Sequence, residues 1–162
     1  MLKLSRAQRP DALPVLRLYQ LCSLQEQCTW DARYPGIENV KKDLADGGLY
    51  VLRSQGRIVA CGSLILPEEG LETGDVFTPA QKPCALARLG VLPDMQRQGF
   101  GKAMLCGILN AARAQGYDAA RLLVSSGNIP ALRLYENAGF IAVGETDAYG
   151  MHWLQMERLL QS

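Results

Sequence analysis

The sequence is poor in histidine, in closely spaced cysteines and in long apolar stretches. Its 162 residues include one histidine, His152, which excludes paired-histidine metal motifs and argues against a histidine-based catalytic triad. The five cysteines are odd in number and form no C-x-x-C pair, which argues against a zinc knuckle and a disulfide framework. We interpret them as buried, reduced thiols and predict a cytoplasmic protein without a bound metal. The longest apolar stretch, residues 58–66, is too short to cross a membrane, and the N-terminus lacks a signal-peptide core.

The chain also lacks a strong net charge. Its 17 Lys and Arg residues against 16 Asp and Glu residues leave a formal charge of +1, which argues against a general nucleic-acid binder or a polybasic membrane-surface protein. The charge is unevenly distributed, because residues 82–116 hold five basic residues and one acid, a net of +4, and leave −3 for the rest. A chain of this length predicts a single domain over residues 1–162.

Hydrophobic periodicity and turn residues predict alternating strands and helices. An apolar stripe of Leu13, Leu16, Tyr19 and Leu24 indicates a first helix after Asp11, and Gln55-Gly56 indicates a hairpin turn. The predicted strands are 2–7, 49–54, 57–66, 84–92, 119–125, 140–144 and 151–160, and the further helices are 37–46, 99–115 and 129–138. The strand–helix–strand from Cys84 to Ser125 should form one right-handed βαβ unit with parallel strands. We therefore expect a mixed α/β (α+β) fold, with a twisted, mostly antiparallel sheet of about seven strands and about four helices on its faces.

A long polar segment, residues 67–83, interrupts this pattern. It carries four acids, Glu68, Glu69, Glu72 and Asp75, which are interpreted most simply as a solvated loop. Loops of this length are also often functional, so a role in the active site stays open.

The segment Gln96-Arg-Gln-Gly-Phe-Gly101 lies between a predicted buried strand and an amphipathic helix. Its glycines allow close backbone approach, and the helix directs unpaired N–H groups and its positive dipole end to the same place, which suits a pyrophosphate. A Walker A loop would need Gly at Gln96 and Ser or Thr at Ala103. A dinucleotide fingerprint would need a third glycine at Met104 and an acid near Arg121. The pattern [QR]-x-x-G-x-[GA] matches completely.

Two longer motifs carry a family resemblance. Residues 89–105, Leu-Gly-Val-Leu-Pro-Asp-Met-Gln-Arg-Gln-Gly-Phe-Gly-Lys-Ala-Met-Leu, and residues 128–140, Asn-Ile-Pro-Ala-Leu-Arg-Leu-Tyr-Glu-Asn-Ala-Gly-Phe, occur in the order expected of the GNAT superfamily of acetyl-CoA-dependent N-acetyltransferases. The sequence resembles that family closely from Cys84 to Phe140, and before that only in architecture. The resemblance implies a GNAT-like fold.

The resemblance also implies roles for individual residues. Strand backbone at Leu89, Gly90 and Val91 would hold the pantetheine arm and the acetyl carbonyl, and Asn128 would hydrogen-bond the pantetheine. Tyr135 would protonate the leaving thiolate, whereas its helical spacing alone would make it a core aromatic on a stripe with Ala131, Leu134 and Ala138. The pyrophosphate would be wrapped by the main chain of Arg97, Gln98, Gly99, Phe100, Gly101 and Lys102.

The general base is not identified by the sequence. Some family members have a Glu where this chain has Leu123, and the equivalent position on the preceding strand is Arg88. The alternatives are an acid of the 68–75 loop, Tyr149, His152 or a water relay, and His152 is interpreted as structural rather than basic. In the family, the region between the first two helices usually lines the acceptor site. Here it offers Trp30 and Tyr34 with Asp31 and Pro35, either an aromatic wall for a small cationic amine or a staple between helices.

The implied function is transfer of an acetyl group from acetyl-CoA, as co-substrate, to a primary amine of a small molecule or peptide. Direct attack in a ternary complex needs no acetyl-enzyme, and Cys106 is expected to be an inert thiol buried in the helix. Two alternatives stay open: a non-catalytic acyl-CoA-binding or sensor domain, and an acyltransferase that prefers another acyl-CoA. No nucleic-acid or membrane partner is expected, and a homodimer is left open.

Overall fold

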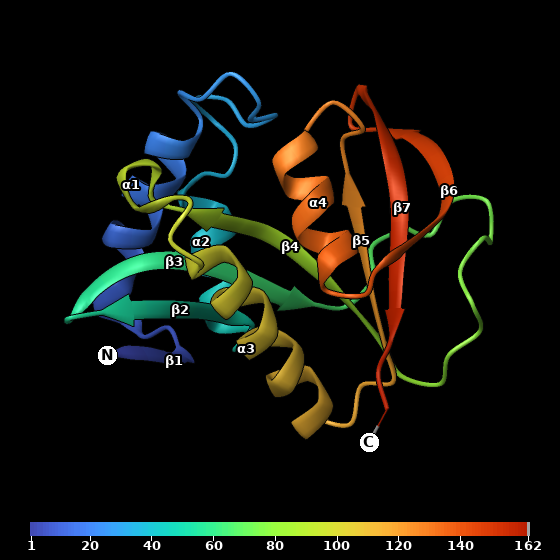
Figure 1. Ribbon diagram of the computed structural model, residues 1–162, viewed down its shortest axis with the longest axis horizontal. Helices are drawn as coiled ribbons and strands as arrows, with labels where there is room; N and C mark the ends of the chain where they lie inside the picture. Colours follow the sequence, from blue (N-terminus) through green and yellow to red (C-terminus); the bar gives the residue numbers. More distant parts are fainter. Residues whose placement is uncertain (162) are drawn as a thin grey trace. The chain divides into compact units, whose positions relative to one another are not determined.

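The computed structural model describes residues 1–161, which form seven β-strands and four α-helices (Figure 1). In chain order these are β1 (Leu2–Arg6), α1 (Ala12–Cys22), α2 (Ile37–Ala45), β2 (Leu49–Ser54), β3 (Arg57–Ile65), β4 (Pro83–Val91), α3 (Phe100–Ala114), β5 (Ala119–Val124), α4 (Ile129–Asn137), β6 (Ile141–Ala148) and β7 (Met151–Leu159). The strand order is β1-β2-β3-β4-β5-β7-β6. The chain divides into two compact units, residues 1–64 with 88–108 and residues 65–87 with 109 onward, and each is described by itself.

In the first unit, β1 pairs antiparallel with β2, and β2 pairs antiparallel with β3 (Figure 1). The predicted hairpin turn between β2 and β3 is confirmed, with Gln55 at φ 52° and Gly56 at φ 81°. Positive φ at both central residues is the geometry that matches the right-handed twist of the two strands. The core of this unit is formed by apolar side chains of α1, α2, β2 and β3, namely Val15, Leu18, Tyr19, Cys22, Val40, Leu49, Val51 and Cys61, together with Leu92.

The buried face of α1 differs from the predicted stripe. Leu13 and Leu24 are 70% and 82% exposed, and of the four residues predicted only Tyr19 is buried. The helix ends at Cys22, and its buried positions follow the i, i+3, i+4, i+7 spacing from Val15. The prediction was wrong because apolar residues occupy more than one face of this helix, and the packing against the core selects one of them.

The second unit contains the parallel pair predicted for the βαβ segment. The beginning of β4 pairs with β5 in parallel, through Pro83↔Ala119 to Ala85↔Arg121, and β7 pairs antiparallel with both β5 and β6. The last strands form the red hairpin of Figure 1. Strand β6 runs from Ile141 to Ala148, longer than the predicted 140–144, because Glu145 to Ala148 pair with β7 in register despite their polar sequence.

The predicted fold class is confirmed by the seven-stranded mixed sheet with one parallel pair and four α-helices. The predicted stripe of α3 is also confirmed, because Met104, Leu105, Ile108, Leu109 and Ala112 are each at most 1% exposed. None of the helices within residues 1–161 has both the length and the apolar character of a membrane span.

Candidate active site

The loop between β4 and α3 is shaped by one glutamine side chain. After β4 ends, a 3₁₀ turn over Pro93–Met95 leads to Gln96. The Gln96 Nε2 donates to the Val91 carbonyl at 3.1 Å and to the Gln25 Oε1 at 3.0 Å. The Gln25 Nε2 donates back to the Gln96 Oε1 at 3.0 Å. Gln96 therefore ties the start of the loop to the end of β4 and to the segment that follows α1.

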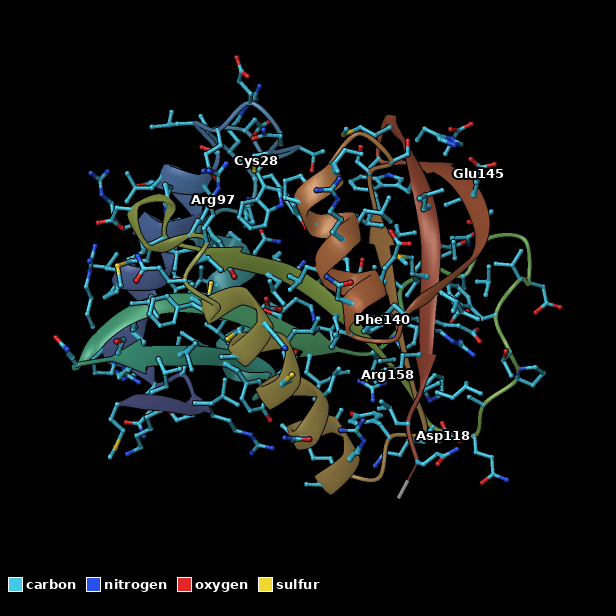
Figure 2. All side chains as sticks on the ribbon, in the orientation of Figure 1. Cys28, Arg97, Asp118, Phe140, Glu145 and Arg158 are labelled. Carbon is cyan, nitrogen blue, oxygen red and sulfur yellow. The ribbon has the colours of Figure 1, made fainter. Side chains whose placement is uncertain are left out.

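The rest of the loop has the backbone geometry of an anion site. Arg97, labelled in Figure 2, has φ 63° and Gly99 has φ 84°, both left-handed, and the residues from Gln96 to Gly99 are exposed. Such alternation turns successive N–H groups toward one side. A Cβ built on Gly99 would have no atom within 4 Å, so its side of the loop is open. We expect a phosphate group to approach there.

The first turn of α3 supplies further donors to the same loop. The N–H of Ala103 bonds to the carbonyl of Gly99 at 3.0 Å, so the N–H groups of Phe100, Gly101 and Lys102 precede the first intrahelical bond. Unpaired N–H groups and the positive end of the helix dipole favour anions. The residues predicted to hold a pyrophosphate therefore fit that group in backbone geometry and in charge.

Arg88, in the middle of β4, has φ 51° and a side chain that is 8% exposed. Left-handed backbone at a non-glycine residue costs about 1–3 kcal/mol and persists only where its surroundings hold it. Two parallel hydrogen bonds do so here: Nε donates to Oδ2 of Asp43, and Nη2 donates to Oδ1, each at 2.9 Å. Ser63 Oγ also donates to Asp43 Oδ2, at 2.6 Å. Burial acts to lower the pKa of Arg88, but Asp43 outweighs it and the pKa is raised.

The two aromatic residues predicted to line the acceptor site both contact β4. Arg88 Nη1 donates to the Tyr34 hydroxyl at 3.2 Å, and Tyr34 is 45% exposed. A Cβ built on Gly90 would lie 3.2 Å from Cη2 of Trp30, so the Trp30 ring lies against this glycine. Trp30 also packs edge-on against Tyr19, with ring centroids 5.3 Å apart. The structure thus brings both aromatics to the strand segment that carries Leu89, Gly90 and Val91.

Asp31, the carboxylate in the same loop, orders the backbone around it. Its Oδ1 accepts the N–H groups of Arg33 and Tyr34 at 2.7 and 2.9 Å. These hydrogen bonds, with that of Arg33 first, lower the pKa of Asp31 below its ordinary value. Asp31 is therefore an exposed, ionised group whose first role is to hold Tyr34 in place.

Asn128 and Tyr135 lie on the second unit, at the start and near the end of α4. Asn128 is the N-cap of the helix, and its Oδ1 accepts the N–H of Ala131 at 3.3 Å, so its amide nitrogen is the part that can serve a ligand. Tyr135 packs edge-on against Phe140, which Figure 2 labels after α4, with ring centroids 5.8 Å apart. It is half-buried, and α4 has no fully buried residue, which weakens its interpretation as a core aromatic.

The hydroxyl of Tyr135 has no hydrogen-bond partner within residues 1–161. Burial raises the pKa of Tyr135 to about 12. The phenol is therefore protonated throughout the physiological pH range, which is the state that a proton donor requires.

The structure weakens one of the candidate bases, His152. Its Nδ1 lies 2.9 Å from Asp147 Oδ1, and its Nε2 lies 3.1 Å from Glu145 Oε1. These hydrogen bonds, with that of Asp147 first, raise the pKa of His152. Carboxylates at both ring nitrogens are best satisfied by the doubly protonated ring, which has no lone pair for a substrate proton. These contacts weigh against His152 as the general base.

The acidic loop before β4 is more structured than the sequence suggested. Glu72, interpreted as solvated, accepts from the buried Arg121 on β5 at 2.8 and 3.1 Å. Gln155 on β7 donates to the loop carbonyls of Leu71 and Thr73 at 2.9 and 2.7 Å. The Tyr149 hydroxyl donates to Glu68 at 3.3 Å. Polar side chains of the sheet thus hold this loop, and Glu72 is committed to an ion pair.

The cysteines are free thiols, and most are unsuited to nucleophilic chemistry. Burial raises the pKa of Cys22, Cys61 and Cys84 to about 12 and raises that of Cys28 as well. The expectation that Cys106 is buried was wrong: it is exposed, because it lies one position beyond the buried Met104–Leu105 pair on α3.

Sequence reasoning missed the polar residues that are buried in each unit. Asp43 was visible in principle, because it stands three positions after the buried Val40 on the inward face of α2. No sequence signal identifies Ser63, Arg121, Gln155 and Glu157 as buried, since each lies on a strand whose partners come from distant segments.

A mixed α/β sheet whose fourth strand leads through a glycine-containing loop into the N-terminus of a helix defines the class of fold. Comparison with known families makes this specific. Residues 15–140 match the description Acetyltransferase (GNAT) family, and the chain belongs to that family. The predicted family and its acyltransferase class are thereby confirmed, and that family uses acetyl-CoA.

Individual relatives are more distant. Mycothiol acetyltransferase of Beutenbergia cavernae is 30% identical over 103 residues, which cover 64% of this chain and 31% of that protein. The chain thus spans about a third of the length of this curated relative. A GNAT-family acetyltransferase from Streptococcus agalactiae superposes with a TM-score of 0.84 at 13% identity, over 99% of this chain and 96% of that one. A Salmonella typhimurium protein, solved with its cofactor acetyl-CoA, gives 0.77 at 17% identity, over 100% and 95%. These similarities show the fold.

Proposed function

We propose that this chain transfers an acetyl group from acetyl-CoA to a primary amine by direct attack in a ternary complex. The observation that supports the proposal is the loop from Gln96 to Lys102, where Arg97 and Gly99 are left-handed, the space beside Gly99 is open, and the first N–H groups of α3 precede its first intrahelical bond. The main chain of Arg97 to Lys102 would bind the pyrophosphate, in accord with the net charge of +4 over residues 82–116. The family match runs through both compact units, which supports one acetyltransferase domain over residues 1–162.

The strand that leads into this loop would bind the other end of the co-substrate. The backbone of Leu89, Gly90 and Val91 would hold the pantetheine and the acetyl carbonyl, and its N–H groups would stabilise the developing oxyanion. The Asn128 amide, free of its capping role at nitrogen, would hydrogen-bond the pantetheine. Acetyl-CoA supplies the activated acetyl group when bound, and the chemistry requires no metal.

Tyr135 would complete the transfer by supplying a proton. The amine nitrogen forms a bond to the carbonyl carbon, and the carbon–sulfur bond breaks. The Tyr135 hydroxyl gives its proton to the departing sulfur, and the attacking nitrogen releases its surplus proton to solvent. The phenolate then takes up a proton from solvent, which restores the phenol. The raised pKa of about 12 keeps Tyr135 protonated at the start of each cycle. The high pKa values of the buried thiols weigh against an acetyl-cysteine intermediate.

The acceptor would bind beside Trp30 and Tyr34, since both contact β4 within the Arg88–Gly90 segment. An aromatic wall next to the ionised Asp31 suits an amine that is small enough, or on a peptide flexible enough, to reach the strand. The ammonium form of the amine loses one proton before attack, and water is the simplest acceptor of that proton because carboxylates engage both ring nitrogens of His152.

The test is binding and turnover with a loop variant. Calorimetry should show CoA and acetyl-CoA binding to the wild-type chain, and free thiol should be released from acetyl-CoA with at least one member of a panel of amines. Gly101→Glu, which places a carboxylate in the first turn of α3, should lower CoA affinity at least about tenfold by repelling the phosphates. Unchanged CoA affinity in this variant would refute the assignment of the loop. Binding without turnover on any amine would instead favour a non-catalytic acyl-CoA-binding domain.

A further inference from the structure

We propose that Arg88 is a positioning residue for acetyl transfer. Asp43 anchors the Arg88 side chain, and this anchor fixes the orientation of the Leu89–Val91 backbone that would receive the thioester. This inference rests on the proposed function, because it concerns the same strand. It goes further by naming a buried ion pair, away from the reacting atoms, as the part of this chain that sets the geometry of the strand.

The first observation is where the left-handed residue lies. Within residues 1–161 the non-glycine residues with positive φ are Gln55, Asp75, Arg88, Arg97 and Tyr149. Four of them lie in turns or loops, where such a conformation is common, and Arg88 alone lies inside a strand. A left-handed residue interrupts the regular alternation of a strand and so decides which way the following peptide groups face. The three residues that follow Arg88 are those proposed to hold the pantetheine and the acetyl carbonyl.

The second observation is how firmly the Arg88 side chain is anchored. Asp43 is 1% exposed and accepts two hydrogen bonds from Arg88 and one from Ser63. A bidentate arginine–carboxylate pair fixes orientation as well as distance. Asp43 belongs to α2, whose Val40 lies in the core cluster of the first unit, and Ser63 belongs to β3. The side chain that turns β4 is thus tied to two packed elements.

The third observation is that the surrounding contacts converge on the same strand segment. The free edge of the Arg88 guanidinium donates to Tyr34, Trp30 lies against Gly90, and the Cys22 thiol donates to the Val91 carbonyl at 3.2 Å. Arg88, Gly90 and Val91 are therefore each contacted by a side chain of α1 or of the loop between α1 and α2.

Stability alone does not account for this arrangement. A buried ion pair is often no more stabilising than apolar residues of the same size, and the left-handed backbone adds a cost. Strain that is held by several independent contacts is characteristic of positions where the backbone geometry itself matters. The geometry points to a clamp on the strand that receives the acetyl group.

The experiment compares variants that loosen the clamp in different ways. Asp43→Asn weakens the anchor without changing its shape, and Arg88→Gly keeps the left-handed conformation available but removes the anchor. Arg88→Lys keeps the charge but loses the bidentate geometry. Asp46→Asn is the matched control, because Asp46 forms an exposed ion pair with Lys42 beside the same helix.

Two measurements are taken on each variant: the Kd values for CoA and for acetyl-CoA by calorimetry, and kcat and KM for acetyl-CoA by thiol release. The first two variants should lower kcat by about 10- to 100-fold, somewhat less than outright removal of an oxyanion donor. Their CoA affinity should fall by no more than about threefold, because only the pantetheine contacts of the strand are loosened and the pyrophosphate loop is untouched. The ratio of the Kd for CoA to the Kd for acetyl-CoA should be smaller in these two variants than in the wild type. The kcat of Arg88→Lys should lie between that of the wild type and those of the two variants.

The opposite results are equally clear. A kcat within about twofold of wild type in folded Asp43→Asn and Arg88→Gly would overturn the inference and leave the proposed function standing. A parallel loss of kcat, CoA affinity and thermal stability would assign the pair a structural role only, and would overturn it too. If Asp43→Asn fails to fold, Ser63→Ala takes its place, because it removes one hydrogen bond to Asp43. Ser63→Ala should give a smaller loss of kcat at unchanged CoA affinity. An unchanged kcat in this variant would count against the clamp. A wild-type chain that binds neither CoA nor acetyl-CoA would refute the proposed function, and this inference with it.

Discussion

Replacing Tyr135 by phenylalanine removes one hydroxyl and leaves its surroundings in place. The ring keeps its edge-on contact with Phe140, at a centroid distance of 5.8 Å, and the hydroxyl has no hydrogen-bond partner within residues 1–161. We therefore expect the free energy of unfolding to change by less than about 0.5 kcal/mol, as for substitutions that break no specific interaction. Any large loss of activity would then reflect chemistry rather than folding.

The size of that loss follows from the acidity of the phenol. A positioned general acid contributes about 10²- to 10⁴-fold to the rate. A phenol with a pKa of about 12 gives its proton to a thiolate, whose conjugate acid has a pKa of about 8.5, at a cost of about 5 kcal/mol if the transfer is complete. Proton transfer must therefore accompany cleavage of the carbon–sulfur bond. We expect Tyr135→Phe to lower kcat by at least about 100-fold with CoA affinity unchanged.

The pH dependence provides the sharper test. With a pKa of about 12, only about one Tyr135 in 10⁴ is ionised at pH 8, so the acid form stays saturated. Thiol release by the wild type should show no alkaline decline attributable to this residue between pH 7 and about 10. A fall in the rate of thiol release between pH 7 and about 10 that is present in the wild type and absent in Tyr135→Phe would refute the raised pKa. A kcat within about threefold of wild type would refute the acid role, and Tyr117→Phe in the same unit serves as control.

Three further predictions test other parts of the chain. Because the chain has a single histidine, NMR can follow its titration directly, and the pKa of His152 should lie above the ordinary value for histidine. The interaction of His152 with Asp147 and Glu145 then stabilises the fold fully below about pH 6.5, and this stabilisation is lost as the pH rises through the folded pKa. His152→Gln should leave the pH profile of acetyl transfer unchanged, and a shifted profile would show that it acts as a base after all. Glu72→Ala should lower the free energy of unfolding by about 1–3 kcal/mol because the buried Arg121 loses its carboxylate partner. The control Glu69→Ala, in the same loop, should change the free energy of unfolding by less than about 0.5 kcal/mol. Equal effects of the two variants in denaturant titrations would contradict the ion pair. Gly90→Ala should lower the free energy of unfolding by about 1–3 kcal/mol because the added methyl group would lie 3.1–3.2 Å from neighbouring side chains. Gly62→Ala, whose methyl group would have its nearest neighbours at 3.6 Å, should be tolerated. A larger loss of stability for Gly62→Ala than for Gly90→Ala would count against the packing at β4.

The parts of the fold that the sequence predicted well depend on local patterns. The turn at Gln55-Gly56 and the buried stripe of α3 are both set by residues within a few positions of one another. Periodicity and turn chemistry act over that range, which is why they can be read without a structure. The β4–α3 loop is local in the same sense, since its glycines and the start of the helix lie within six residues.

Other elements depended on packing. The buried face of α1 was predicted wrongly because Leu13 is apolar but exposed, and Leu24 lies beyond the end of the helix. The sequence of a single helix cannot show which of its apolar faces will be covered. Strand β6 extends through Glu145 and Asp147 because β7 offers a pairing partner, which outweighs their weak preference for strands.

By itself, the sequence determined the family and the place of the loop proposed to bind the pyrophosphate, because the motifs that define them are contiguous. Only the tertiary structure decided which charges are buried and paired: Arg88 meets Asp43 across 45 positions, and Arg121 meets Glu72 across 49. A charged residue has no periodic signature that names its partner. The pairing is fixed by the path of the chain, which carries α2 to β4 and the acidic loop to β5, and burial then makes each pair geometrically specific.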